Sequence, residues 1–164
     1  MKKFLFLTTL FALLISAEAK FKFAPASIER YSHLQFTWWG FKVYKAEIWT
    51  PKAQKPDFKD KIILHINYQR DIKSDKLISS TRDEWKRLKL IRPESEIWLL
   101  RLARIWPDIK KGDSLTTYIN GNKTSFYQGD KLLGEVIDKN FGSTFIQIWL
   151  HKKSQTSELL QRVK

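Results

Sequence analysis

A change in the spacing of apolar residues between Ile62 and Lys89 constrains the fold most strongly. Over Ile62–Tyr68 apolar and polar side chains alternate, which predicts a strand with one buried face. From Lys73 to about Lys89 the apolar residues recur at helical spacing and occupy one arc of about 100°. This segment is predicted to be an amphipathic helix, and Ser74 or Asp71 is expected to cap its start.

Further strands and helices are predicted on both sides of this pair. Lys20–Gln35 has few clear signals, whereas Phe36–Trp49 is aromatic and β-branched and is predicted to be one strand. The other predicted elements are a helix over Glu94–Ile105 opened by Pro93, strands over Leu115–Ile119, Thr124–Gln128 and Lys131–Val136 with a hairpin at Asn120-Gly121, a helix over Lys139–Leu150 capped by Asp138, and a short helix over Ser157–Val163. The order predicts an α+β fold with an antiparallel sheet.

Length and composition limit the number of domains and the kinds of catalytic or metal site that the chain can contain. The chain has 164 residues, enough for one domain, and 43% of them are apolar. It has no cysteine, which excludes disulfides, thiolate metal sites and a cysteine nucleophile. The three histidines lack metal-site spacing, and neither a Gly-x-Ser-x-Gly motif nor a glycine-rich phosphate loop is present. We therefore predict no catalytic residue, no metal and no cofactor.

The N-terminus has the pattern of a secretory signal peptide. Lys2 and Lys3 precede the apolar run Phe4–Ile15, and Ala17 and Ala19 provide the small residues before a cleavage site. The run is shorter than the ~20 residues needed to span a bilayer. We expect residues 1–19 to be removed and residues 20–164 to form a single domain. The short basic start is typical of bacteria, so the expected location is the periplasm or the medium.

The net charge of +13 leaves two interpretations open. Basic residues are scattered, and no run of them is longer than two. A nucleic-acid-binding protein would usually gather them in one stripe, so nucleic acid is not expected as a partner. The charge is either a solvated basic surface or a means of attraction to an anionic membrane surface.

Five segments together resemble the exported bacterial branch of the chalcone isomerase-like family. They are Gly40–Trp49, Tyr68–Ile72, Trp106–Asp113, Phe126–Glu135 and Phe145–Leu150. The resemblance covers roughly Tyr31 to Gln161 in the same order. It implies an open-faced β-sandwich in which helices pack on one face of a long antiparallel sheet, with a ligand cleft between them.

The resemblance also implies candidate site residues. Fatty-acid-binding members of the family hold a carboxylate with an arginine and a tyrosine, and the matching positions here are Arg30 and Tyr44. The family's enzymes close a flavanone ring and carry a Tyr-x-x-Lys-x-x-x-Asn pattern on the first helix. Here that pattern is replaced by Lys73, Lys76 and Ser80, which keeps only the lysine. These three residues face either a cleft rim or solvent.

Arg70 is a further candidate at the end of the predicted strand Ile62–Tyr68. It either binds an anion or pairs with Asp71 or a helix end.

Three functions follow as hypotheses. The favoured one is an exported, non-catalytic binding protein for a fatty acid or similar apolar anion. The first alternative is an isomerase (an intramolecular lyase of the chalcone isomerase type) acting on an enone. The second is an envelope structural or interaction protein whose cleft is filled by its seven tryptophans.

Overall fold

The computed structural model describes residues 20–58 and 60–163. The predicted signal peptide lies outside this range. The predicted α+β fold, with an antiparallel sheet and helices on one face, is confirmed.

The sheet contains six antiparallel strands in sequence order. They are β1 (Ile28–Trp38), β2 (Phe41–Pro51), β3 (Ile62–Tyr68), β4 (Ser114–Asn120), β5 (Lys123–Gln128) and β6 (Lys131–Ile137). The alternation predicted for Ile62–Tyr68 is realised, because Ile62, Leu64 and Ile66 point into the main core. Ile63 points to the opposite face of the sheet.

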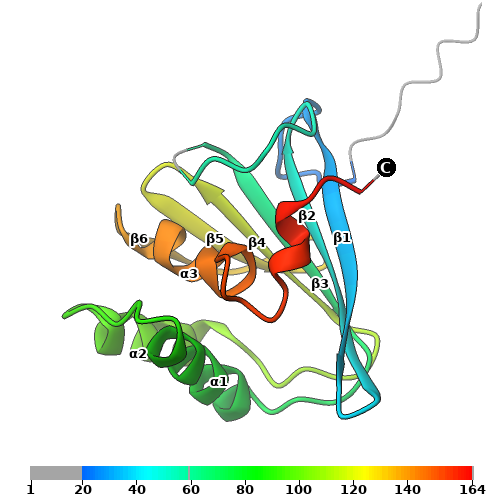
Figure 1. The fold of residues 1–164 in the computed structure, drawn as a ribbon. Coiled ribbons are helices and arrows are strands. Elements are labelled where there is room, and N and C mark those ends of the chain that lie inside the picture. Colours follow the sequence, from blue (N-terminus) through cyan, green and yellow to red (C-terminus); the bar gives the residue numbers. More distant parts are fainter. Residues whose placement is uncertain (1–19, 59, 164) are drawn as a thin grey trace, which may run out of the picture.

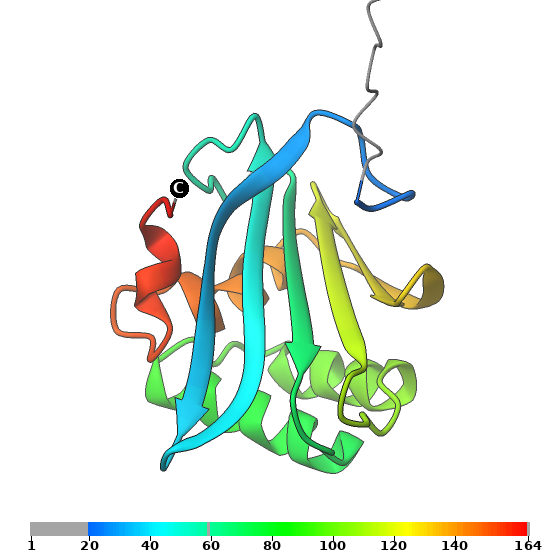
Figure 2. The same ribbon diagram turned by 90° about the vertical axis from the view of Figure 1, so that its right-hand side faces the viewer.

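The helices lie together on one side of this sheet. They are α1 (Ser74–Arg87), α2 (Ser95–Ile105), α3 (Phe141–Leu150) and the short 3₁₀ helix η1 (Ser157–Leu160). Figure 1 shows the sheet nearly edge-on beside them, and Figure 2 shows them behind it. Helix α3 begins at Phe141, two residues later than predicted, and Asn140 rather than Asp138 occupies the N-cap position. The Asp138 carboxylate still accepts hydrogen bonds from the backbone N–H groups of Asn140 and Phe141.

Aromatic rings form the centre of the core between the layers. Trp85, Trp98, Phe126, Phe141 and Phe145 are almost completely buried. The rings of Trp98 and Phe141 meet edge to face with centroids 5.5 Å apart, and those of Phe126 and Phe145 do the same at 5.6 Å. A core of interlocked rings suits a chain with only one methionine.

The structure of the first two strands differs from the prediction made from the sequence. The predicted single strand over Phe36–Trp49 is a hairpin, because Trp39 and Gly40 both take left-handed backbone angles (φ of 50° and 79°) and reverse the chain. The aromatic character of the run continues through the turn and conceals it. The Lys20–Gln35 segment, which has few clear sequence signals, contains most of β1.

The opposite face of the sheet carries a smaller aromatic cluster. Phe21 and Phe23, which precede β1, pack over Ile63 and Tyr118. Phe23 also stacks on Tyr127 with centroids 3.7 Å apart. The face away from the helices is thus partly covered by the segment that begins at Lys20.

Candidate binding cavity

A cavity of about 780 Å³ lies between the sheet and the helical layer. Its volume falls in the range of about 300–1,000 Å³ that is usual for small-molecule sites. Apolar and aromatic side chains dominate the lining, which includes Phe36, Val43, Tyr44, Ile66, Tyr68, Leu77, Trp106, Leu115, Phe145, Ile148 and Trp149. The alternative in which tryptophans fill the cleft is wrong for this structure, because Trp106 and Trp149 line the space without closing it.

Paired strands build the sheet wall. Tyr44 on β2 lies opposite Phe36 on β1 and Tyr68 on β3, so all three side chains project to the helical side. The Phe36 and Tyr44 rings stack with centroids 4.9 Å apart, and the Tyr44 and Tyr68 rings meet edge to face at 6.1 Å. The sheet wall of the cavity is therefore aromatic.

Burial keeps both phenols of this wall neutral. It raises the pKa of Tyr44 well above the ordinary phenol value, while the nearby Trp149 indole acts in the opposite direction and the charge of Glu84 adds to the rise. Burial raises the pKa of Tyr68 in the same way, with a smaller effect from Tyr44. Each hydroxyl therefore retains a proton that it can donate.

The indole of Trp106 adds a buried donor without a partner. Its Nε1–H group makes no hydrogen bond within residues 20–58 and 60–163, and Trp106 lines the cavity. A buried donor left without an acceptor is unfavourable by about 1–3 kcal/mol. An acceptor supplied by a ligand would remove this penalty.

Helix α1 forms the opposite wall. Lys76, Leu77, Ser80, Thr81 and Glu84 line the cavity, at the spacing of one helical face. The Thr81 hydroxyl donates to the carbonyl of Leu77, four residues earlier, so it is satisfied within the helix.

The start of α1 is held from a distant part of the chain. The carboxylate of Asp108 accepts hydrogen bonds from the backbone N–H of Ser74 at 2.9 Å and from Nζ of Lys73 at 2.7 Å. The expectation that Ser74 or Asp71 caps this helix is wrong. Asp71 instead accepts hydrogen bonds from Lys110 and Lys111.

The cavity opens where β3 leads into α1. Exposed lining residues gather there, among them Arg70, Lys73 and Lys76. Lys73 is neutralised by Asp108, whereas Arg70 and Lys76 make no ion pair within the part of the chain that the structure describes. Two cations at the opening are thus available to an anion.

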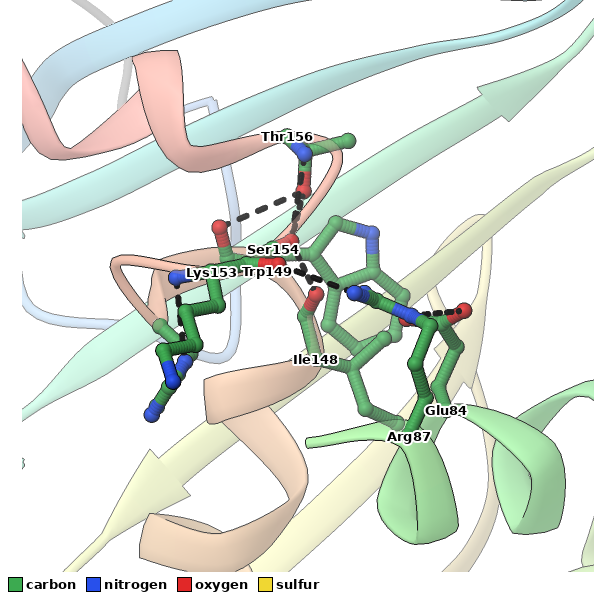
Figure 3. A network of polar contacts seen from close by, with 8 residues as sticks. Glu84, Arg87, Ile148, Trp149, Lys153, Ser154 and Thr156 are labelled. Carbon is green, nitrogen blue, oxygen red and sulfur yellow. Dashed lines mark hydrogen bonds and ion pairs between the residues drawn. The ribbon is translucent and has the colours of Figure 1, made fainter. Parts of the chain in front are cut away.

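A polar network fixes another side of the cavity (Figure 3). Glu84 pairs with Arg87 at 2.5 Å, and Arg87 also donates to the backbone carbonyl of Lys153 at 2.9 Å. In the same loop the Ser154 hydroxyl donates to the carbonyl of Ile148. These bonds tie α1 to the segment that follows α3, and they compensate the charge of the Glu84 carboxylate.

Arg30 lies elsewhere, and its predicted place at the site is corrected. It sits opposite Trp49 on the face of the sheet away from the helices, and it pairs with Glu47 at 3.3 Å. The cause is a β-bulge between Arg30 and Ser32, because one extra residue reverses which face a side chain points to.

The other five predicted site residues come together around the cavity. Tyr44, Arg70, Lys73, Lys76 and Ser80 all line it. The sequence interpretation missed Trp106, Trp149 and Glu84. Helical spacing indicates only that such residues face inward, and it does not distinguish a filled core from a cavity wall.

No group of three or more His, Asp or Glu side chains that could hold a metal occurs among the described residues. The described helices are also too short or too polar to cross a membrane.

Known proteins share the fold and part of the sequence of this chain. A solved fatty-acid binding protein of Arabidopsis thaliana superposes with a TM-score of 0.59 over 82% of this chain and 84% of its own, at 8% identity. An uncharacterized protein of Haemophilus influenzae is 24% identical over 120 residues, which are 73% of this chain and 59% of that protein's length. The family model described as chalcone isomerase-like matches residues 37–162. The chain therefore belongs to the chalcone isomerase-like family.

Proposed function

We propose that this chain is a non-catalytic binding protein that holds a fatty acid or similar apolar anion in the cavity. One observation carries the proposal: an apolar cavity of about 780 Å³ opens beside two cations, Arg70 and Lys76, that have no acidic partner among the described residues. The structurally similar Arabidopsis thaliana protein is a fatty-acid binding protein, which supports the same class of ligand.

The chemistry of the lining sets the orientation of the ligand. An acyl chain inside the cavity would gain about 0.8 kcal/mol for each CH₂ group removed from water. Its carboxylate is best held at the opening, where the Arg70 guanidinium can form charge-assisted hydrogen bonds. Placed farther along α1, it would lie near the Glu84 carboxylate, which lines the cavity as well. We therefore assign the carboxylate to Arg70 and Lys76 and the chain to the rings.

Titration with palmitate, followed by tryptophan fluorescence, tests this assignment. The double variant Arg70→Ala/Lys76→Ala should bind palmitate several-fold more weakly than the parent. Arg30→Ala is the matched control, because it removes an arginine from the opposite face of the sheet, and it should bind like the parent. Hexadecanol, which has the same chain and no charge, should not distinguish the variants. Equal palmitate binding by all three proteins would overturn the assignment.

We also propose that the protein acts after export, in the periplasm or the medium. The support is the basic start followed by the apolar run Phe4–Ile15 and the small residues before Lys20. Determination of the N-terminus of the protein recovered from the periplasm and medium of a bacterial host checks this. A chain that begins at Lys20 is expected, and an uncleaved chain retained in the cytoplasm would contradict it.

A further inference from the structure

Three large apolar side chains are exposed at the tip of the β1–β2 hairpin. Trp38, Trp39 and Phe41 expose 51%, 84% and 68% of their surfaces. The turn itself requires positive φ at two central residues, and asparagine or glycine usually occupies both positions. Trp39 fills one of them with φ of 50°. Neither the turn nor the core explains a tryptophan there.

The segment around this tip contains basic residues and lacks acidic ones. From Arg30 to Ala46 the chain contains no Asp or Glu, while Lys42 and Lys45 follow the turn on β2. Trp38 lines the cavity together with Arg70 and Lys76, so the aromatic tip and the unpaired cations border one opening. Figures 1 and 2 agree that the hairpin turn and the β3–α1 connection lie at the same end of the sheet.

We propose that the hairpin tip docks on a bilayer that contains anionic phospholipid, and that the bound ligand passes between bilayer and cavity at this contact. The ligand part of this inference rests on the proposed function. Tryptophan rings favour the headgroup region of a membrane, where their apolar surface is removed from water and the N–H remains hydrated. Basic side chains beside them gain attraction to anionic headgroups. Docking by this edge turns the cavity opening toward the lipid.

Charge favours a bilayer over a second copy of the chain. A symmetric dimer formed tip to tip would bring the same cations of two molecules together. An anionic membrane instead offers the opposite charge and an apolar layer in one surface.

Co-sedimentation with vesicles tests the docking. The parent protein should bind vesicles of phosphatidylcholine and phosphatidylglycerol (3:1) more tightly than vesicles of phosphatidylcholine alone, and added salt should weaken the difference. The variant Trp39→Ala/Phe41→Ala should bind the anionic vesicles about tenfold more weakly or worse. Ile97→Ala/Leu100→Ala is the matched control, because it removes two exposed apolar side chains from α2. It should bind like the parent.

Two results would overturn the docking. One is that the parent does not bind anionic vesicles or that the tip variant binds them equally well. The other is a concentration-dependent dimer of the parent that the tip variant abolishes, which would identify a second copy as the occupant.

Palmitate titration without vesicles separates this inference from the proposed function. The tip variant should bind palmitate in solution as the parent does, yet take it up more slowly from loaded anionic vesicles. Normal palmitate binding without vesicle docking would overturn the docking alone. Vesicle docking by a protein that does not bind palmitate would overturn the ligand proposal and leave the docking in place.

Discussion

Two phenols, Tyr44 and Tyr68, lie against each other in the sheet wall of the cavity. Because burial raises the pKa of both, the folded protein holds them neutral at alkaline pH, where unfolded tyrosines near their ordinary value of about 10 ionise. Rising pH therefore favours the unfolded state.

The free energy of unfolding should be insensitive to these groups below about pH 9 and should fall above about pH 10. The expected slope is up to about 1.4 kcal/mol per pH unit for each phenol. Urea denaturation of the parent and of Tyr44→Phe/Tyr68→Phe at several alkaline pH values measures it. The double variant should lose much of the slope, and an identical pH dependence for both proteins would contradict this role of the two phenols.

The direction of the Arg30 side chain could not be predicted from the sequence. Counting along an ideal strand assigns it to the same face as Phe36, six residues later. The bulge at Tyr31 reverses that assignment, and no residue type in the segment signals the bulge. The family resemblance suggested both Arg30 and Tyr44, and the strand pairing places only Tyr44 on the helical side of the sheet.

At the scale of elements, α1 depends on a residue from beyond α2. Asp108 accepts hydrogen bonds from the start of α1 and neutralises Lys73 at the cavity opening. Local sequence suggested only Ser74 or Asp71 for this role. A cap that is 34 residues away in the chain follows from the packing of the β3–α1 and α2–β4 connections, which pair through Ile72 and Ile109.

Asp108→Asn should tighten palmitate binding. The amide oxygen can still accept the hydrogen bond from Ser74, but Lys73 loses its counter-charge and becomes a third free cation at the opening. Glu96→Gln is the control, because it removes the partner of Arg82 from an exposed ion pair in which neither residue lines the cavity. Isothermal titration compares the two variants. Equal or weaker binding by Asp108→Asn would argue against a carboxylate at the opening.

Helix α3 approaches the sheet closely through Gly142. A Cβ atom at this position would lie 2.8 Å from side-chain atoms of both Ile119 and Thr124. Gly142→Ala should therefore destabilise the fold by about 1–3 kcal/mol, despite the better helix propensity of alanine. Ser143→Ala, one residue along α3, adds no atoms and should change stability less. Thermal or urea unfolding measures both, and a stabilised Gly142→Ala would show that the contact is looser than the structure indicates.

Several other elements could be predicted from local sequence patterns alone. Alternation predicted β3, and helical spacing predicted α1 and α2. Asn120-Gly121 predicted the β4–β5 hairpin, although the two turn residues are Gly121 and Asn122, one residue later. The β1–β2 turn was missed because Trp39 occupies a position where turn residues are expected.

At the scale of the whole molecule, one end of the sheet combines three features. The cavity opening, the unpaired cations Arg70 and Lys76, and the exposed hairpin tip all lie there. Composition indicated a basic domain rich in aromatic residues, the order of the predicted elements indicated an α+β fold, and the family resemblance indicated a cleft. Whether the rings fill that cleft or surround it depends on side-chain packing across several elements, which no single stretch of sequence encodes.

Native mass spectrometry of the protein, purified without detergent and then incubated with palmitate, tests the central claim most directly. We predict one bound palmitate on the parent. We also predict loss of the ligand in Ser80→Trp, where the new ring enters the cavity, and retention in Ser79→Trp, whose position on α1 does not line it. A parent that remains empty, or a ligand that Ser80→Trp retains, would contradict a binding site between the sheet and α1.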